Sequence, residues 1–303
     1  MTAYVAGIDG GGSSVRVALL DDRRNLLAES RGETVNPSVV GLEIAASRIH
    51  AALFAALEAA GLQPNEVIAA GIGVAGASAS HSAGWLRDVV HTVLPQARVI
   101  PASDYEIALV GAHGERRGVL VLAGTGSLAY GINDTGDSAL VGGWGYLLGD
   151  EGGGYWIGLE GLRAAIAAVE GRDSHTVLVE SLLDALKLEI PRALIPWLYR
   201  AEQPRTRDIA ALAPVVFAAA SGGDSVAQAI VERGADALAA CAQAVIRQLR
   251  LPSPAIAFTG GLLEADNPLS RALCRRLNLD ALPVPRFSAV IGAALLALEA
   301  ARE

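Results

Sequence analysis

The order of apolar and polar positions along the chain predicts an α/β protein, in which short buried strands alternate with helices that have one apolar face. Apolar runs of strand length, several of them rich in β-branched residues, predict strands at 4–9, 15–20, 26–30, 67–74, 98–101, 119–123, 128–132 and 255–258. Helical spacing predicts helices from Leu42 to Ala60, where Gly61 would end the helix, and at 85–94 and 105–114. This alternation favours sheets covered by helices.

Two parts of the chain repeat the same order of elements. Strand 4–9, the glycine turn 10–14 and strand 15–20 correspond in type to strand 119–123, the turn 124–127 and strand 128–132. A further turn follows each pair, at 21–25 and at 133–137. The repeat predicts a duplicated fold.

The chain becomes mainly helical after Gly154. Glycine, serine or proline interrupts this part near 171–174, at Pro191, at Pro204 and at 222–223. Asp224 or Ser225 would cap a helix that runs to about Arg250 with one buried face, and a last helix is predicted at 288–301.

Composition limits the class of protein. A chain of 303 residues, of which 52% are hydrophobic, can bury a large core in one large domain or two. Its apolar stretches are interrupted and its first residues lack a signal-peptide pattern, so we expect a soluble cytoplasmic protein without membrane contact. The net charge of −8 argues against nucleic acid as a partner.

The metal-binding side chains follow no known framework. Cys241 and Cys274 are the two cysteines, and both lie in helical patterns, which fits a reducing compartment and a place in the core. The five histidines have no ligand spacing. Lys187 is the single lysine, so the Gly-Lys pair of a Walker loop is absent. Any bound phosphate would depend on backbone N–H groups, hydroxyls, a metal ion or arginine.

Both glycine turns are candidates for anion binding. Glycine tolerates a positive φ, which would let consecutive N–H groups converge on one anion, and the hydroxyls of Ser13, Thr125 and Ser127 would add donors. Asp9 ends the strand before the first turn, where a phosphate-bound Mg²⁺ would sit.

Two further acidic positions indicate a site. Asp104 follows the strand at 98–101 and begins a helix, so it would lie at the carboxyl end of a strand, where α/β proteins place chemistry. Ser103 or Asp104 would also cap that helix. Asp150 and Glu151 stand between glycines just before a helix, which favours recognition of hydroxyl groups at a bend.

The segment from Gly71 to Gly76 matches the pattern G-x-G-x-x-G of dinucleotide-binding proteins. That motif needs an acidic residue about twenty positions further on, at the end of a second strand. Asp104 comes too late for this role. We therefore expect a structural turn.

The motifs in chain order carry a family resemblance. The segments DGGGSS, VNPS, SD before a helix, GTGS, GGWG, GDEGG, TGG and SAVIGAALLAL resemble the N-acetylglucosamine kinase and BadF/BadG/BcrA/BcrD-type ATPase family, within the actin-like ATPase and sugar kinase superfamily, over nearly the whole chain. The resemblance implies an α/β fold of two ribonuclease-H-like domains that face a cleft. The first would span 1–114 together with the helix 289–303. The second would span 115–288, with a helical insertion at about 158–250.

The resemblance also implies a set of site residues. Asp104 would be the catalytic base, and Asp9 would hold Mg²⁺ directly or through water. The amino sugar would bind at Asn36, Trp144, Gly145 and Asp150. ATP would bind at Gly10, Gly11, Gly12, Ser13, Gly124, Thr125, Gly126, Ser127, Gly260 and Gly261.

The implied reaction is phosphorylation of the primary (6-) hydroxyl of N-acetylglucosamine or a close relative by ATP, in a homodimeric enzyme. Pro37-Ser38 and Gly142 replace an aromatic residue and a cysteine of the animal members. N-acetylglucosamine, glucosamine and N-acetylmuramic acid therefore all stay open as substrates.

Three other functions stay open. A BadF-type activator ATPase shares an iron–sulfur cluster across its dimer, which needs two suitably placed cysteines. A sugar-responsive sensor would bind without catalysis, and related sensors carry a basic DNA-binding segment that we do not find before Tyr4. A dinucleotide-dependent oxidoreductase would use the segment 71–76.

Overall fold

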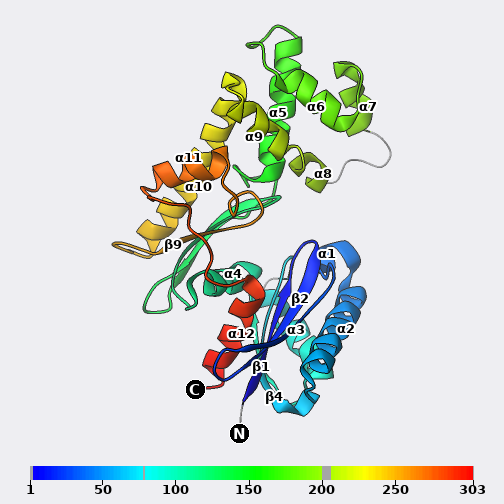
Figure 1. Cartoon of the computed structure of the whole chain (residues 1–303), viewed down its shortest axis with the longest axis vertical. Helices are drawn as coiled ribbons and strands as arrows, with labels where there is room; N and C mark the ends of the chain where they lie inside the picture. The colour runs from blue at the N-terminus through cyan, green and yellow to red at the C-terminus, as the bar shows by residue number, and fades with distance from the viewer. Residues whose placement is uncertain (1–2, 78, 200–205, 303) are drawn as a thin grey trace. The chain divides into compact units, whose positions relative to one another are not determined.

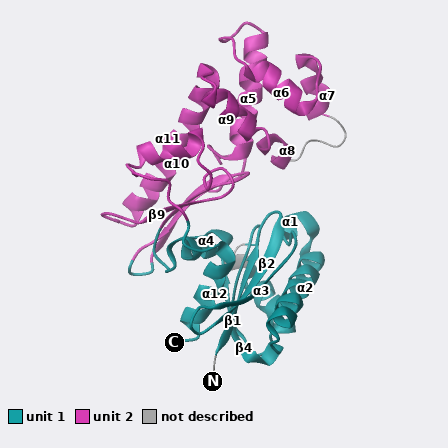
Figure 2. Ribbon diagram, in the orientation of Figure 1, with its two compact units in different colours: residues 1–118, 134–136, 285–303 teal, residues 119–133, 137–284 magenta. Residues whose placement is uncertain are grey.

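The computed structural model describes residues 3–77, 79–199 and 206–302 (Figure 1). These residues form two compact units (Figure 2): unit 1 consists of Met1–Gly118, Asp134–Gly136 and Pro285–Glu303, and unit 2 of Val119–Asn133 and Asp137–Val284. The segments 115–118 and 285–288 thus belong to unit 1, whereas the sequence predicts them in the second domain.

Unit 1 is built on a five-stranded sheet in the order β3-β2-β1-β4-β5. Its strands are β1 (Tyr4–Gly10), β2 (Ser14–Asp21), β3 (Leu26–Glu33), β4 (Val67–Val74) and β5 (Arg98–Ala102). The β1 strand pairs antiparallel with β2 and parallel with β4, and β4 pairs parallel with β5. Because β1, β4 and β5 run in the same direction, their carboxyl ends lie at one edge of the sheet.

Helices cover both faces of this sheet. They are α1 (Pro37–Val40), α2 (Leu42–Ala60), α3 (Ala79–Val93), α4 (Asp104–His113) and α12 (Ala289–Ala300), with a 3₁₀ turn at Pro64–Glu66. The α2 helix ends as predicted, because Gly61 adopts a left-handed φ of 67° and its N–H caps the last turn.

The period-two alternation of the strands decides which helix each side chain meets. Ala6 and Ile8 of β1 pack in a cluster with α2 and α3, whereas Val5 packs in a cluster with α12. Gly7 also lies under α12, since a Cβ there would come within 2.1 Å of the Val290 carbonyl oxygen. The missing side chain lets the helix backbone approach the sheet closely.

Unit 2 repeats this design. Its sheet has the order β8-β7-β6-β9, and the strands are β6 (Gly118–Ala123), β7 (Ser127–Ile132), β8 (Ser138–Gly142) and β9 (Ile256–Thr259). The β6 strand pairs parallel with β9, and β7 pairs antiparallel with β8. This order corresponds to β3-β2-β1-β4 of unit 1, so the predicted duplication and the α/β class are confirmed.

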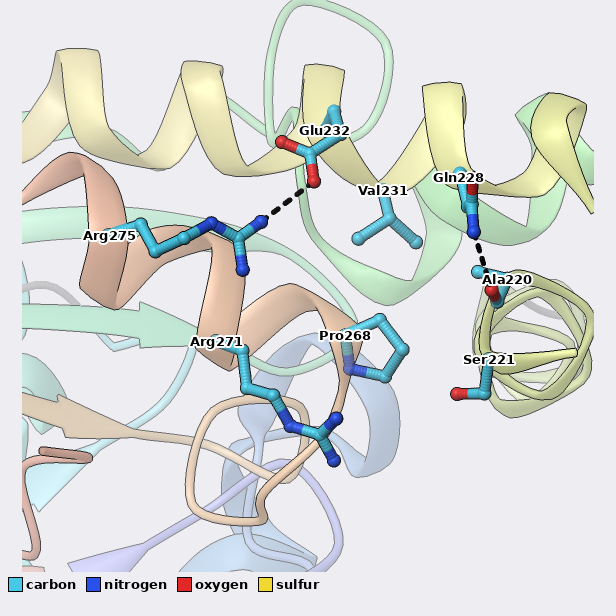
Figure 3. A pocket seen from close by; sticks show the side chains of 8 residues that line it. All are labelled: Ala220, Ser221, Gln228, Val231, Glu232, Pro268, Arg271 and Arg275. Atoms are coloured by element: carbon cyan, nitrogen blue, oxygen red, sulfur yellow. Dashed lines mark hydrogen bonds and ion pairs between the residues drawn. The ribbon is translucent and has the colours of Figure 1, made fainter. Parts of the chain in front are cut away.

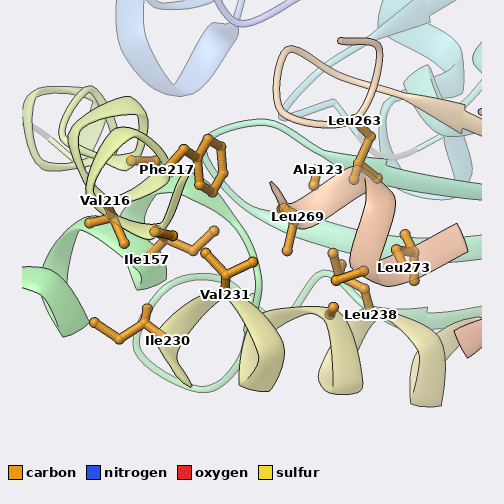
Figure 4. Close-up of a cluster of buried hydrophobic side chains, with 14 of the residues drawn as sticks. Ala123, Ile157, Val216, Phe217, Ile230, Val231, Leu238, Leu263, Leu269 and Leu273 are labelled. Carbon is orange, nitrogen blue, oxygen red and sulfur yellow. The ribbon is translucent and has the colours of Figure 1, made fainter. Parts of the chain in front are cut away.

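The helices of unit 2 bury its core. They are α5 (Gly154–Val169), α6 (Leu178–Leu186), α7 (Leu194–Leu198), α8 (Thr206–Ala210), α9 (Ala213–Ser221), α10 (Ser225–Gln248) and α11 (Pro268–Arg276), with a 3₁₀ turn at Pro191–Ala193. Figure 4 shows part of this core, in which Ile230, Val231 and Leu238 of α10 lie among side chains of the other helices. Asp224 caps α10 by accepting a 2.8 Å hydrogen bond from Ala227 N.

Both cysteines pack in this cluster, as predicted. Cys274 of α11 is buried, and Cys241 of α10 is half-buried. Burial raises the pKa of each thiol, which disfavours the thiolate that would ligate iron or another metal.

In the part of the chain that the structure describes, no single helix has both the length and the apolar composition needed to cross a bilayer. Thr206–Ser221 and Ser225–Gln248 meet these criteria only as a pair, which is bent by 119°.

Candidate active site

Two acidic side chains stand at the carboxyl edge of the unit 1 sheet. Asp9 is the penultimate residue of β1 and pairs with Arg16 of β2. Asp104 is the first residue of α4, and one residue, Ser103, separates it from β5. The Ser103 hydroxyl caps this helix by accepting a 3.1 Å hydrogen bond from Glu106 N, so Asp104 is not needed as the cap.

The two carboxyl groups interact electrostatically. Burial raises the pKa of Asp9 from 3.8 to about 6, Arg16 lowers it in part, and the Asp104 charge raises it further. Burial also raises the pKa of Asp104, and a hydrogen bond from Tyr105 N to its Oδ1 at 3.0 Å opposes that shift. Two half-buried carboxyl groups with raised pKa values form a place where a proton or a cation is favoured.

The raised pKa of Asp9 predicts a pH-dependent cost to stability. The native pKa of about 6 lies above the ordinary value of 3.8, so the folded state binds the Asp9 proton more tightly than the unfolded state does. The contribution of this proton to the free energy of unfolding is complete below pH 3.8 and is lost as the pH rises through 6. We therefore expect Asp9→Asn, which resembles the neutral carboxyl group, to raise the melting temperature above that of the wild type at about pH 7.5, and the gain to shrink towards about pH 4. Calorimetry of both proteins without nucleotide measures this, and a gain that is constant with pH would contradict it.

The first glycine turn combines packed and open positions. A Cβ at Gly10 would come within 2.7 Å of Val35 Cγ2, so glycine is required there for packing. Gly12 and Ser13 are exposed, and a Cβ at Gly12 would meet nothing within 4 Å. A ligand can therefore approach the backbone at Gly12.

Asn36 is held beside this turn by Thr34. The Thr34 hydroxyl donates to Gly11 O and accepts from Asn36 N, each at 3.3 Å. The Asn36 side chain caps α1 by accepting from Ser38 N at 2.9 Å. Sequence reasoning did not single out Thr34 or Arg16, although a hydroxyl two residues before Asn36 and a basic residue across the hairpin from Asp9 are visible signals.

The glycines of the G-x-G-x-x-G segment are explained by packing. Gly71 and Gly73 lie within β4, where a Cβ would come within 2.0 Å of Ala293 O and 2.9 Å of Ser103 O, respectively. A Cβ at Gly76 would come within 2.4 Å of Asn36 Oδ1. The predicted turn comprises only residues 75 and 76, because the segment up to Val74 belongs to β4.

The second glycine turn is tied to the start of α5. Gly154 N donates to Gly124 O at 2.8 Å, and Tyr155 N donates to Thr125 O at 3.0 Å. Thr125 is exposed, and a Cβ at Gly124 would meet nothing within 4 Å. The hydrogen bonds to α5 hold this turn in place, and its backbone at Gly124 and the Thr125 hydroxyl are accessible to a ligand.

The prediction that glycines of the two turns adopt a positive φ is wrong. Of the glycines at 10–12, 124 and 126, none has a φ in the left-handed region. Positive φ occurs instead at Gly142, Gly143, Gly145 and Gly152, and at Gly260. The turns bind their own chain through hairpin pairing, and the conformational freedom of glycine is used in the loop that follows β8.

That loop, 143–149, carries Trp144 and Gly145. Trp144 is 75% exposed, and Leu147 and Leu148 are 80% and 79% exposed. The Tyr146 ring packs against Tyr155 of α5, with centroids 4.8 Å apart, which fixes the loop to the helix.

Asp150 and Ser127 hold the loop on the second turn. Asp150 Oδ1 accepts a hydrogen bond from Gly145 N at 3.2 Å, and burial raises the pKa of this carboxyl group. The Ser127 hydroxyl is nearly buried and donates to Glu151 O at 2.8 Å. The sequence predicts that the Ser127 hydroxyl donates a hydrogen bond to phosphate, but in the structure it donates to the backbone of the protein.

Gly260 and Gly261 follow β9 and have different surroundings. A Cβ at Gly260 would come within 2.4 Å of Ala123 O, and its φ is 88°, so only glycine fits. Gly261 is exposed and open on the Cβ side. A flat ligand could approach the backbone at Gly261.

Two other features of the structure were candidates for a functional site: a metal-binding cluster and a pocket in unit 2. Among residues 3–77, 79–199 and 206–302, no group of three or more His, Cys, Asp or Glu could hold a metal ion. A hollow of about 460 Å³ lies among α9, α10 and α11 (Figure 3). Its arginines are already paired, Arg271 with Asp266 and Arg275 with Glu232, and it contains no predicted site residue.

The duplicated sheets and their glycine turns define a protein of the actin-like ATPase fold. The model of the BadF/BadG/BcrA/BcrD ATPase family matches residues 6–297, and the chain belongs to this family.

Relatives with assigned activities are similar to nearly the whole chain. An N-acetylmuramic acid/N-acetylglucosamine kinase of Clostridium acetobutylicum is 34% identical over 281 residues, which cover 91% of each chain. An N-acetyl-D-glucosamine kinase of Dictyostelium discoideum is 30% identical over 311 residues, covering 96% of this chain and 97% of that one. The crystal structure of a Chromobacterium violaceum protein, assigned by inference as an N-acetylglucosamine kinase, matches with a TM-score of 0.77 and 30% identity, over 98% of this chain and 99% of the other.

Proposed function

We propose that this protein is an ATP-dependent amino-sugar kinase that phosphorylates the primary (6-) hydroxyl of N-acetylglucosamine or a close relative. Family membership and the activities of the relatives support an ATP-dependent sugar kinase. The observation that carries the assignment is Asp104, a half-buried carboxylate at the carboxyl edge of the unit 1 sheet whose pKa is raised by burial.

Asp104 acts as the general base. As the sugar oxygen attacks the γ-phosphorus, its proton passes to the Asp104 carboxylate, the bond from phosphorus to the bridging oxygen breaks, and ADP leaves. Phosphoryl transfer relies on positioning and charge neutralisation more than on covalent help from the protein. The raised pKa brings Asp104 closer to the proton affinity that a base needs near neutral pH.

The residues that would hold ATP are those with open backbone. Gly12, Gly124 and Gly261 have no atom within 4 Å of a would-be Cβ, so phosphates or a nucleoside can approach their N–H groups. Ser13 and Thr125 present exposed hydroxyls. In the absence of a P-loop lysine, these donors take the place of a side-chain cation.

Asp9 fits a magnesium ion that accompanies ATP, directly or through water. Its raised pKa reflects a buried carboxyl group that a nearby cation would return to the ionised form. Mg²⁺ prefers carboxylate, phosphate and water oxygens and needs few protein ligands, which suits a site without a preformed cluster. When bound, it would neutralise charge on the phosphates.

The sugar would bind at Asn36, Trp144, Gly145 and Asp150. Trp144 presents an exposed indole that can pack against the apolar face of a sugar ring. The amide of Asn36 can exchange hydrogen bonds with a hydroxyl or an acetamido group. N-acetylglucosamine, N-acetylmuramic acid and glucosamine all carry hydroxyl groups that such donors and acceptors bind.

The test is release of ADP from Mg-ATP with N-acetylglucosamine, N-acetylmuramic acid, glucosamine, glucose or no sugar. We expect one amino sugar to stimulate ADP release strongly over the reaction without sugar, and the phosphorylated product to carry its phosphate on the primary hydroxyl. Hydrolysis that is independent of sugar would contradict the proposal and favour an activator ATPase. Absence of ADP release with every sugar would favour a sensor.

A further inference from the structure

Two glycine segments of unit 2, the turn 124–127 and the loop 143–149, meet at the side chain of Asp150. Gly145 N donates to Asp150 Oδ1 at 3.2 Å, so the carboxylate closes the loop 143–149 on itself. The backbone N–H of Ser127 favours the ionised form of the same carboxyl group and so opposes the rise of its pKa. A Cβ at Gly126 would come within 2.2 Å of Asp150 Oδ2, which shows that this oxygen lies directly against the second glycine turn.

The backbone around Asp150 is built to hold this arrangement. Asp150 has a φ of 61°, a left-handed conformation that aspartate adopts far less often than glycine. Its carbonyl oxygen accepts from Gly153 N at 3.0 Å, and Gly143 N donates to Ser127 O, also at 3.0 Å. These bonds fix Asp150 between the turn and the loop.

We propose that Asp150 is a positioning residue that couples the nucleotide turn, Gly124–Ser127, to the sugar loop, Gly143–Gly149, so that its carboxylate supports the binding of both substrates. The inference rests on the proposed function for both its nucleotide half and its sugar half. The carboxylate connects the turn that would bind phosphate with the loop that would bind sugar, because Oδ1 accepts a charge-assisted hydrogen bond from the loop and Oδ2 lies against the turn. Sugar binding alone would not explain why this carboxylate lies against the nucleotide turn.

The direct test is Asp150→Asn, which keeps the shape of the side chain and tolerates the left-handed backbone. The amide has one acceptor oxygen in place of two, so when that oxygen keeps the bond from Gly145 N, an NH₂ donor replaces Oδ2 against the turn and the charge is lost. We expect affinity for a non-hydrolysable ATP analogue with Mg²⁺, measured by calorimetry without sugar, to fall about tenfold, the scale of one lost hydrogen bond to a charged group. The KM for the sugar should rise as well.

Glu189→Gln is the matched control. It makes the same change of charge in the same unit, at an exposed residue between α6 and the 3₁₀ turn at Pro191–Ala193. We expect both affinities to stay within about twofold of the wild type, as for an exposed substitution away from special features. Thermal unfolding of each variant shows whether the fold is kept.

A second variant disturbs the same contact from the other side. Gly126→Ala would push a methyl group against Asp150 Oδ2 without removing the carboxylate. We expect it to weaken the nucleotide analogue as Asp150→Asn does, and the double variant to lose less than the two single losses combined, because both act on one contact.

The outcomes separate this inference from the proposed function. Unchanged affinity for the analogue in Asp150→Asn would overturn the coupling, whether or not the sugar KM rises. A wild-type protein that binds the analogue but phosphorylates no amino sugar would instead overturn the proposed function. Additive losses in the double variant would show that Gly126 and Asp150 act separately and would also overturn the coupling.

Discussion

Replacing Asp104 with asparagine is expected to lower the turnover number for sugar phosphorylation by about two to four orders of magnitude, the usual contribution of a general base. The amide cannot accept the hydroxyl proton, while its shape preserves the packing around the start of α4. The helix keeps its cap, because Ser103 rather than Asp104 bonds to Glu106 N. Binding of Mg-ATP and sugar should therefore stay close to that of the wild type.

The measurement is the rate of ADP release at saturating substrates, with substrate binding measured by calorimetry. Asp88→Asn serves as the control, since it removes an exposed carboxylate from the same unit. Turnover near the wild-type value in Asp104→Asn would remove Asp104 as the base. Loss of sugar binding together with turnover would show that Asp104 serves in binding.

Gly71→Ala is expected to destabilise unit 1 by about 3 kcal/mol, the upper end of the usual cost of overpacking a core. A Cβ there would lie 2.0 Å from Ala293 O and 2.8 Å from its carbonyl carbon. Both are backbone atoms of α12, so no flexible side chain can move aside. The melting temperature should fall by about 10 °C.

Gly84→Ala is the matched control for this substitution. Gly84 is an exposed position of α3 with no atom within 4 Å of a would-be Cβ. Alanine should stabilise the helix there by about 0.5 kcal/mol, because glycine loses more backbone entropy on folding. Equal melting temperatures for the two variants would contradict the close approach of α12 to β4.

Local pattern was enough to place the main elements. The helix Leu42–Ala60 has the predicted ends, because its apolar spacing and the glycine after it are both short-range signals. The strand β8 was not predicted as a separate element, since its run of five residues is partly exposed and begins beside a turn. The structure shows that β8 pairs with β7 as β3 pairs with β2.

The candidate site was predictable in its residue types and less so in their roles. Carboxylates after strands and glycines in turns are visible in the sequence, and Asp9 and Asp104 both lie at the expected edge. Burial raises the pKa of both carboxyl groups, and the Asp104 charge raises that of Asp9 further; these effects arise only when β1 and β5 belong to the same folded sheet. The same holds for Asp150, whose partner Ser127 lies in a different segment of the chain.

The sequence by itself determined the α/β class, the duplication and the chemistry available, because alternation, helical spacing and turn residues act over a few neighbouring positions. The tertiary structure decided which glycines are open to a ligand and which are filled. Gly12 and Gly124 face open space, whereas Gly71 and Gly126 face Ala293 and Asp150. The sequence does not distinguish an open glycine from a packed one, because the difference depends on segments that are distant along the chain.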